Sequence, residues 1–180
     1  MSEYQGTFKR YEKKYLVTQQ QYNALAKVFA ARMVPDRFAE STISNIYYDT
    51  PDFRLIRRSL DRPAYKEKLR LRTYRTPGAD TEAFVEIKKK YDHIVYKRRV
   101  AMTYSEAQAY LDGGAAPEQS QISREIDWFL HFYKGIQPAM CICYDRLALF
   151  DKYQPELRVT FDSGIRWRMD DLDLSSGSAG

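Results

Sequence analysis

The chain has 180 residues, of which 44% are hydrophobic and 29% charged, and its 29 basic and 24 acidic residues give a formal net charge of +5. This length suits a single folded domain, and the basic excess favours a polyanionic partner such as polyphosphate, a nucleotide, nucleic acid or anionic lipid. No stretch approaches the roughly 18–20 consecutive apolar residues that a membrane-spanning helix needs, so the sequence predicts no membrane segment.

In chain order, the first expected elements are a strand, a helix, a second strand and a short helix. We expect the first strand over 8–17 and the first helix over 18–33, where a capping threonine begins the helix and Pro35 ends it. The second strand covers 43–49. The run Thr50-Pro51-Asp52 then combines a capping hydroxyl, an early proline and an early acid, which is typical of a helix start.

The rest of the chain contains more strands than helices. Strands are expected over 65–75, 84–90, 94–102, 140–147 and 156–168, and a turn at Asp92-His93 joins the second and third of these into a hairpin. One helix begins at Ser105 as its cap, and a longer one covers 118–133. Because strands and helices do not alternate strictly, the pattern predicts an antiparallel α+β domain over 1–170, followed by a flexible Ser/Gly-rich tail over 171–180.

The two cysteines, Cys141 and Cys143, lie in an expected strand. We interpret them as facing opposite sides of that strand and as reduced residues that pack like small hydrophobes. Reduced cysteines fit a cytoplasmic protein, which is the location that we expect.

Charged residues share one face on five of the expected strands, because successive side chains of a strand point to opposite faces. An ordinary sheet with one wet and one buried face explains any single strand of this kind, but five such strands are harder to explain in this way. The shared faces hold Arg10, Glu12 and Lys14; Lys66, Lys68, Arg70 and Arg72; Glu86, Lys88 and Lys90; Lys97 and Arg99; and Glu156, Arg158 and Asp162.

Like charges on neighbouring strands repel each other, and a bound polyanion would offset this repulsion. The opposite faces are apolar, with Leu69, Leu71, Val85, Ile87, Val159 and Phe161, and would pack against the helices over 18–33 and 118–133. This arrangement favours a sheet closed into a barrel with its charged face inward and its helices outside. An open RNA-binding sheet is the alternative, but aromatic residues such as Tyr11 and Tyr15 alternate away from the basic face, so we expect no nucleic-acid partner.

Two acids, Glu12 and Glu86, share the basic face. Carboxylate oxygens beside bound phosphates are typical ligands of Mg²⁺ or Mn²⁺, so the two glutamates are candidate metal ligands. Charge compensation by buried ion pairs explains them equally well. Phosphoryl transfer depends mainly on positioned cations, which suits a chain with two histidines and no evident catalytic triad.

Several segments, taken in order, resemble a known family. They are Arg10-Tyr11-Glu12-Lys13-Lys14-Tyr15, Tyr47-Tyr48-Asp49-Thr50-Pro51, Tyr65-Lys66-Glu67-Lys68-Leu69-Arg70-Leu71-Arg72, Phe84-Val85-Glu86-Ile87-Lys88, Lys97-Arg98-Arg99 and Tyr144-Asp145-Arg146. From about Phe8 to Arg168 the chain resembles the VTC (vacuolar transporter chaperone) domain. This domain is the polyphosphate polymerase branch of the triphosphate tunnel metalloenzymes, in the CYTH-like superfamily.

The resemblance implies an eight-stranded antiparallel tunnel, in which a nucleoside triphosphate donates its terminal phosphoryl group to polyphosphate with Mn²⁺ or Mg²⁺. The nucleoside triphosphate and polyphosphate are therefore the expected partners. By the same resemblance, the catalytic cations are Arg70, Arg72, Lys88, Arg146 and Arg158. Further phosphate-binding residues are Arg10, Lys14, Arg57, Lys68, Lys97 and Arg99, with Arg58 as an alternative to Arg57.

The sequence departs from the family pattern in two places. Arg10 replaces the first acid of the superfamily's Glu-x-Glu-x-Lys motif, which suits the polymerase branch. The family's last strand, with a metal-binding glutamate and a lysine, has no counterpart before Gly180, so about seven strands and an incomplete metal site are expected here. An inorganic tripolyphosphatase and a non-catalytic polyphosphate-binding module remain as alternative functions.

Overall fold

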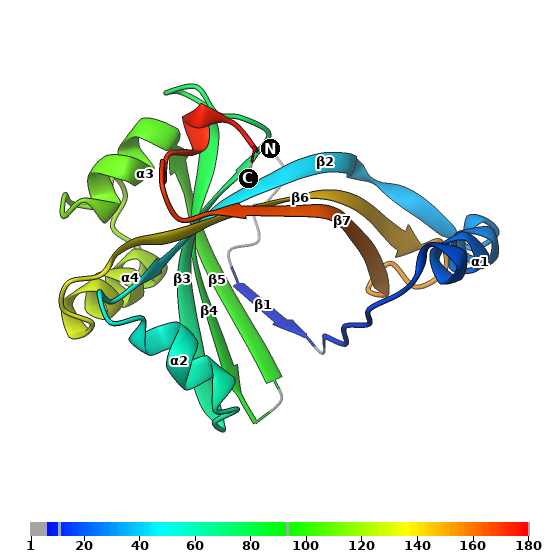
Figure 1. Cartoon of the computed structure of the whole chain (residues 1–180), viewed down its shortest axis with the longest axis horizontal. Coiled ribbons are helices and arrows are strands. Elements are labelled where there is room, and N and C mark those ends of the chain that lie inside the picture. Colours follow the sequence, from blue (N-terminus) through cyan, green and yellow to red (C-terminus); the bar gives the residue numbers. More distant parts are fainter. Residues whose placement is uncertain (1–6, 11, 93, 180) are drawn as a thin grey trace.

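A computed structural model describes residues 7–10, 12–92 and 94–179 (Figure 1). Seven strands form one antiparallel sheet in the spatial order β1-β5-β4-β3-β2-β6-β7. The strands are β1 (Thr7–Arg10), β2 (Met33–Asp49), β3 (Tyr65–Tyr74), β4 (Glu82–Tyr91), β5 (Ile94–Thr103), β6 (Gln137–Asp151) and β7 (Arg158–Arg168). The predicted antiparallel α+β class is confirmed.

Four α-helices accompany the sheet in the described residues, and none of them is long and apolar enough to cross a bilayer. They are α1 (Gln19–Ala30), α2 (Arg54–Leu60), α3 (Tyr104–Leu111) and α4 (Gln121–Phe132). In Figure 1, α2, α3 and α4 lie outside the curled sheet, and α1 lies at the far end of β2, β6 and β7. We call the side of the sheet that α3 and α4 cover its outer face, and the opposite side its inner face.

The predicted closed barrel is wrong for the described part of the chain. β1 pairs with β5 and β7 pairs with β6, which leaves β1 and β7 at opposite edges of the sheet. Closing a barrel requires a hydrogen-bonded ladder between the two edge strands, and the described residues form none between β1 and β7. The sheet is therefore a curled half-barrel whose inner face is open on one side.

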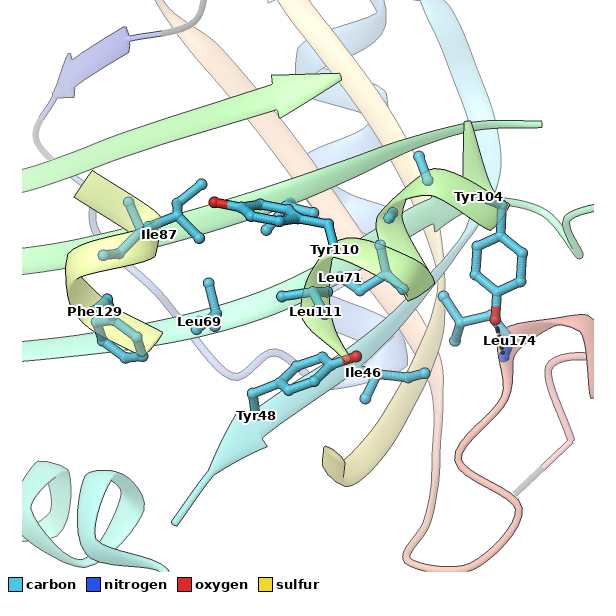
Figure 2. Close-up of a cluster of buried hydrophobic side chains, with 14 of the residues drawn as sticks. Ile46, Tyr48, Leu69, Leu71, Ile87, Tyr104, Tyr110, Leu111, Phe129 and Leu174 are labelled. Atoms are coloured by element: carbon cyan, nitrogen blue, oxygen red, sulfur yellow. Dashed lines mark hydrogen bonds between the residues drawn. The ribbon is translucent and has the colours of Figure 1, made fainter. Parts of the chain in front are cut away.

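The hydrophobic core lies between the outer face and the helices (Figure 2). Leu69 and Leu71 of β3 and Ile87 of β4 are at most 1% exposed, and they pack in one cluster with Phe129 of α4. At the other end of the sheet, the ring of Phe161 in β7 lies 4.9 Å from that of Tyr22 in α1, measured between centroids. The predicted packing against the apolar strand faces is confirmed for α4, whereas α1 contacts Phe161 but contributes no buried residue to the core.

Several element boundaries differ from the prediction. β1 ends at Arg10, and residues 12–18 continue without strand pairing, because the chain leaves the sheet to reach α1. Pro35 does not follow the first helix as a terminator but lies inside β2, next to a register irregularity where a missing N–H is tolerated. Thr103, not Ser105, caps α3: its Oγ1 accepts a hydrogen bond from Glu106 N.

The cysteine side chains lie together, not on opposite faces as predicted. Residues two apart in a regular strand share a face, and the Sγ atoms of Cys141 and Cys143 are 3.7 Å apart in the core. The tail also differs from the expected flexible segment over residues 171–179. Leu174 is fully buried and its N–H donates to the hydroxyl of Tyr104 in α3 (Figure 2), while Arg168 donates to the carbonyls of Asp171, Asp173, Gly177 and Ala179.

Candidate anion-binding site

Strand register brings the basic residues of β3, β4 and β5 together on the inner face. Lys68 of β3 lies opposite Lys88 of β4, and Lys88 lies opposite Lys97 of β5. Arg70 lies opposite Glu86, which in turn lies opposite Arg99. Because these pairs are direct cross-strand neighbours, three strands contribute to one continuous charged surface.

The carboxylate of Glu86 is at the centre of this surface and is 1% exposed. Its Oε2 accepts a hydrogen bond from Nε of Arg70 at 2.7 Å and lies 2.6 Å from Nη2 of the same arginine. Its Oε1 lies 2.6 Å from Nζ of Lys97, and Nε of Arg72 is 3.9 Å from Oε2. One buried acid of β4 is therefore shared by three cations from β3 and β5, the two strands that flank it.

Polar residues of β2 and β6 hold the two arginines of β3 from the other side. Arg70 donates to the hydroxyl of Tyr47 at 3.0 Å. Arg72 donates to Oδ1 of Asn45 at 2.9 Å and to the hydroxyl of Tyr144 at 3.0 Å. These hydrogen bonds fix both guanidinium groups in the inner face.

β6 and β7 extend the charged surface beyond Tyr144. Arg146 forms a bidentate ion pair with Asp162 through contacts of 2.7 and 2.8 Å, and its guanidinium carbon lies 5.1 Å from the centre of the Tyr144 ring. On the opposite side of the surface, at β4 and β5, the guanidinium carbon of Arg99 lies 4.6 Å from the centre of the Phe84 ring. Aromatic rings thus support arginines at both sides of the surface.

The segment after β1 brings one more acid to the site. Lys88 donates to Oε2 of Glu12 at 2.7 Å, and Nζ of Lys14 lies 4.0 Å from the other oxygen of Glu12. Lys14 itself is largely exposed. The segment over residues 12–18 therefore borders the inner face without forming part of the sheet.

Burial and charge shift the pKa values of the central groups in different directions. Burial acts to raise the pKa of Glu86, but the charges of Arg70, Arg72 and Lys97 outweigh it and hold this pKa far below its usual value. For Lys97, burial lowers the pKa to about 7, although Glu86 partly opposes the shift. Burial likewise lowers the pKa values of Lys68 and Lys88. Protonated lysines are thus electrostatically disfavoured here, which is the situation that a bound anion would relieve.

Comparison with known proteins identifies the family. The profile of the VTC domain matches residues 9–179. The chain belongs to the VTC domain family. A search among curated proteins returned no match.

Two solved structures resemble this VTC domain. A candidate adenylate cyclase from Bacillus halodurans is 14% identical, with a TM-score of 0.55, over 89% of this chain and 83% of that one. A candidate adenylate cyclase from Vibrio parahaemolyticus is 15% identical, with a TM-score of 0.44, over 93% and 78% of the two chains. At this identity, the likeness to the Bacillus halodurans structure shows a shared fold and no more.

Not every predicted site residue of this VTC domain reaches the central cluster. Arg158, the first residue of β7, pairs with Asp36. It lies four residues before Asp162, which is about 13 Å along a strand. Arg57 lies on α2 and pairs with Asp52, and both side chains are more than half exposed. The side chain of Arg10 lies outside the described residues. The cluster thus gathers Lys14, Lys68, Arg70, Arg72, Lys88, Lys97, Arg99 and Arg146.

The two predicted metal ligands do not form a metal-binding set. Glu86 and Glu12 each face cations, and across the described residues no three His, Cys, Asp or Glu side chains gather at distances suited to a metal ion. Mg²⁺ and Mn²⁺ need several oxygen ligands, so the donors present do not fit either ion. The alternative interpretation, charge compensation by ion pairs, describes the observed contacts of both glutamates, although only those of Glu86 are buried.

Sequence reasoning missed the residues that accept hydrogen bonds from the arginines, namely Asn45, Tyr47 and Tyr144. Their positions alternate with core residues, as those of the basic residues do, and this period was the available signal. The structure also revises the argument that aromatic residues alternate away from the basic face, since Tyr47, Tyr144 and Phe84 lie on that face. Their rings are next to arginine guanidinium groups, so they are poorly placed as stacking platforms for bases.

Proposed function

We propose that this VTC domain holds a linear chain of phosphates against its inner face and transfers the terminal phosphoryl group of a nucleoside triphosphate to polyphosphate. The observation that supports this function is the convergence of cations from β3, β4, β5 and β6, which outnumber Glu12, Glu86 and Asp162 among the described side chains of the cluster. A row of phosphates needs such an extended set of cations, whereas a single carboxylate or phosphate ligand does not.

In this proposal, each side chain acts through its position. Arg70 and Arg72 are held by Tyr47, Asn45 and Tyr144, so they need little reorganisation to contact phosphate oxygens. Arg146 and Lys88 extend the contact along the chain of phosphates. Phosphoryl transfer spreads negative charge over the transferred oxygens, and fixed cations stabilise this charge in the transition state. Arg158 would contact a longer chain near the end of β7.

A product assay with ATP and Mn²⁺ tests this function, and the requirement for Mn²⁺ or Mg²⁺ stays a prediction. We expect polyphosphate to form and to lengthen with time. Release of phosphate from tripolyphosphate without chain growth would indicate a hydrolase, and tight polyphosphate binding without turnover would indicate a binding module. Formation of cyclic AMP, which the name of the Bacillus halodurans relative suggests, would contradict the polymerase.

The variant Arg146→Ala tests the role of the inner face. We expect product formation to fall by about 100-fold or more, because removing one donor that stabilises transition-state charge typically has this effect. Arg98→Ala is the matched control. Arg98 has a similarly exposed side chain and an ion pair with Glu125, but it faces outward. Equal loss of activity in the two variants would contradict the assignment of the inner face.

A further inference from the structure

Glu86 has an unusual place in a surface that would bind anions, because an acid at its centre repels such ligands. We propose that Glu86 is an internal counter-ion, which neutralises Arg70, Arg72 and Lys97 in the protein without ligand and competes with a phosphate chain for the same cations. This inference rests on the proposed binding of phosphates to the inner face. It assigns to Glu86 a positioning and affinity-limiting role in place of the metal-binding role that its place on the basic face suggested.

The contacts of Glu86 suit a counter-ion better than a metal ligand. Both of its oxygens face cations, with Arg70 and Arg72 at Oε2 and Lys97 at Oε1. A divalent ion at either oxygen would be placed among three positive charges in a buried region, where screening by solvent is weak. A phosphate chain has the opposite sign, so its oxygens can replace the carboxylate as the partner of these cations.

The arginines keep other partners if Glu86 loses its charge. Arg72 still donates to Asn45 and Tyr144, and Arg70 still donates to Tyr47. The guanidinium groups therefore stay directed into the inner face when glutamine replaces glutamate, and the amide oxygen of glutamine can still accept a hydrogen bond. The main consequence of the substitution is electrostatic: the protein without ligand loses a buried partner charge, and a bound anion loses a repulsive neighbour.

The outer face of the same strands provides a matched arrangement. Glu125 of α4 is shared by Lys89 of β4 and Arg98 of β5, and its contact with Arg98 is 2.6 Å. Lys89 and Arg98 directly follow Lys88 and Lys97, so this cluster lies on the other side of the same two strands. Its side chains are 20–33% exposed, and no residue of the proposed anion site belongs to it. Glu125→Gln thus removes a shared carboxylate without changing the inner face.

The experiment measures tripolyphosphate binding by titration calorimetry and unfolding by thermal melting, for the wild type, Glu86→Gln and Glu125→Gln. Both variants are expected to melt at lower temperature than the wild type without ligand. Glu86→Gln is expected to bind tripolyphosphate about tenfold more tightly or better, because a repulsive charge inside the site has been removed. Glu125→Gln is expected to bind with unchanged affinity.

Different results overturn different claims. If the wild type does not bind tripolyphosphate, the proposed function fails, and the counter-ion role fails with it. If the wild type binds and Glu86→Gln binds equally or less well, the counter-ion role alone is overturned. Loss of Mn²⁺ binding in Glu86→Gln, with no gain in affinity for tripolyphosphate, would restore the metal-ligand interpretation.

Glu86→Gln could fail to fold because it leaves buried cations without their acid. In that case the variant is refolded with tripolyphosphate and, separately, with sodium chloride at equal ionic strength. A ligand that binds only the folded state stabilises it by mass action, so tripolyphosphate is expected to restore a cooperative unfolding transition and chloride is not. Absence of this rescue would overturn the proposal.

Discussion

Lys97 extends its ammonium group into a buried part of the inner face, where Glu86 attracts it and Arg70 and Arg72 repel it. Burial has the largest effect, and it brings the pKa of Lys97 down to about 7. Unfolding would return this pKa to its ordinary, higher value, so the folded protein binds fewer protons than the unfolded chain at pH values between the two. The contribution of Lys97 to the free energy of unfolding therefore rises as pH increases above about 7. Its attraction for anions falls over the same range, because the ammonium group loses its charge.

This opposition predicts a specific pH dependence of binding. Between pH 7 and 9, the affinity of the wild type for tripolyphosphate should decrease as Lys97 loses its proton. In Lys97→Arg the charge persists over this range, so the decrease should be smaller. Calorimetric titrations at several pH values, with the same buffer ions and ionic strength, measure the difference. Because Lys68 and Lys88 are unchanged in the variant, identical pH profiles of the two proteins would contradict the role given to Lys97.

At the residue level, the sequence showed which cations share a face but not which groups hold them. The alternation of Lys68, Arg70 and Arg72 with leucines follows from the two-residue period of a strand, and this requires no knowledge of neighbouring strands. The contacts of Arg72 with Asn45 and Tyr144 depend on the register of β2 with β3 and with β6. That register is set by distant parts of the chain, so these partners could not be predicted from local spacing.

Among the elements, helices α3 and α4 are defined by their first turns. Each has a reciprocal set of hydrogen bonds between the capping residue and the third helical position, begun by Thr103 in α3 and by Ser120 in α4. The sequence predicted both helices but placed the cap of α3 at Ser105. Thr103 also ends β5, and its double role as strand end and helix cap is visible only once the strand is placed.

Substitution of the two candidate caps tests this assignment. Thr103→Ala should lower the free energy of unfolding by about 1 kcal/mol, because it removes the oxygen that accepts from Glu106 N. Ser105→Ala should change it by less than about 0.5 kcal/mol, since Ser105 is exposed and its Oγ contacts only the Thr103 hydroxyl among the described side-chain hydrogen bonds. Urea unfolding of both variants provides the comparison. A larger effect at Ser105 would reverse the assignment.

For the whole molecule, the sequence predicted the class and the two-faced sheet, but not its closure. A charged face opposite an apolar face is compatible with a barrel and with a half-barrel, because both bury the same side chains. The difference lies in the pairing of β1 and β7, two strands from opposite ends of the chain. The composition of the tail likewise suggested flexibility, while Leu174 packs beside Tyr104 (Figure 2).

The packing of the tail predicts that Leu174 contributes to global stability. Leu174→Ala should lower the free energy of unfolding by about 2–5 kcal/mol, as is typical when a fully buried leucine is truncated. Leu60→Ala, at a leucine that is 72% exposed on α2, should have a much smaller effect. Thermal or urea unfolding of both variants measures this. Equal stability of Leu174→Ala and the wild type would support the flexible tail that the composition suggested.

The open side of the half-barrel affects how a long polymer would reach the cations. In a closed tube, a chain must be threaded end first, so only its termini can start the process. In the described part of this domain, β1 and β7 do not pair with each other. A polymer can therefore bind to the inner face through any internal stretch of its phosphates, without first inserting one of its ends. The rate of association would then depend on the number of phosphate units and not on the number of chain ends.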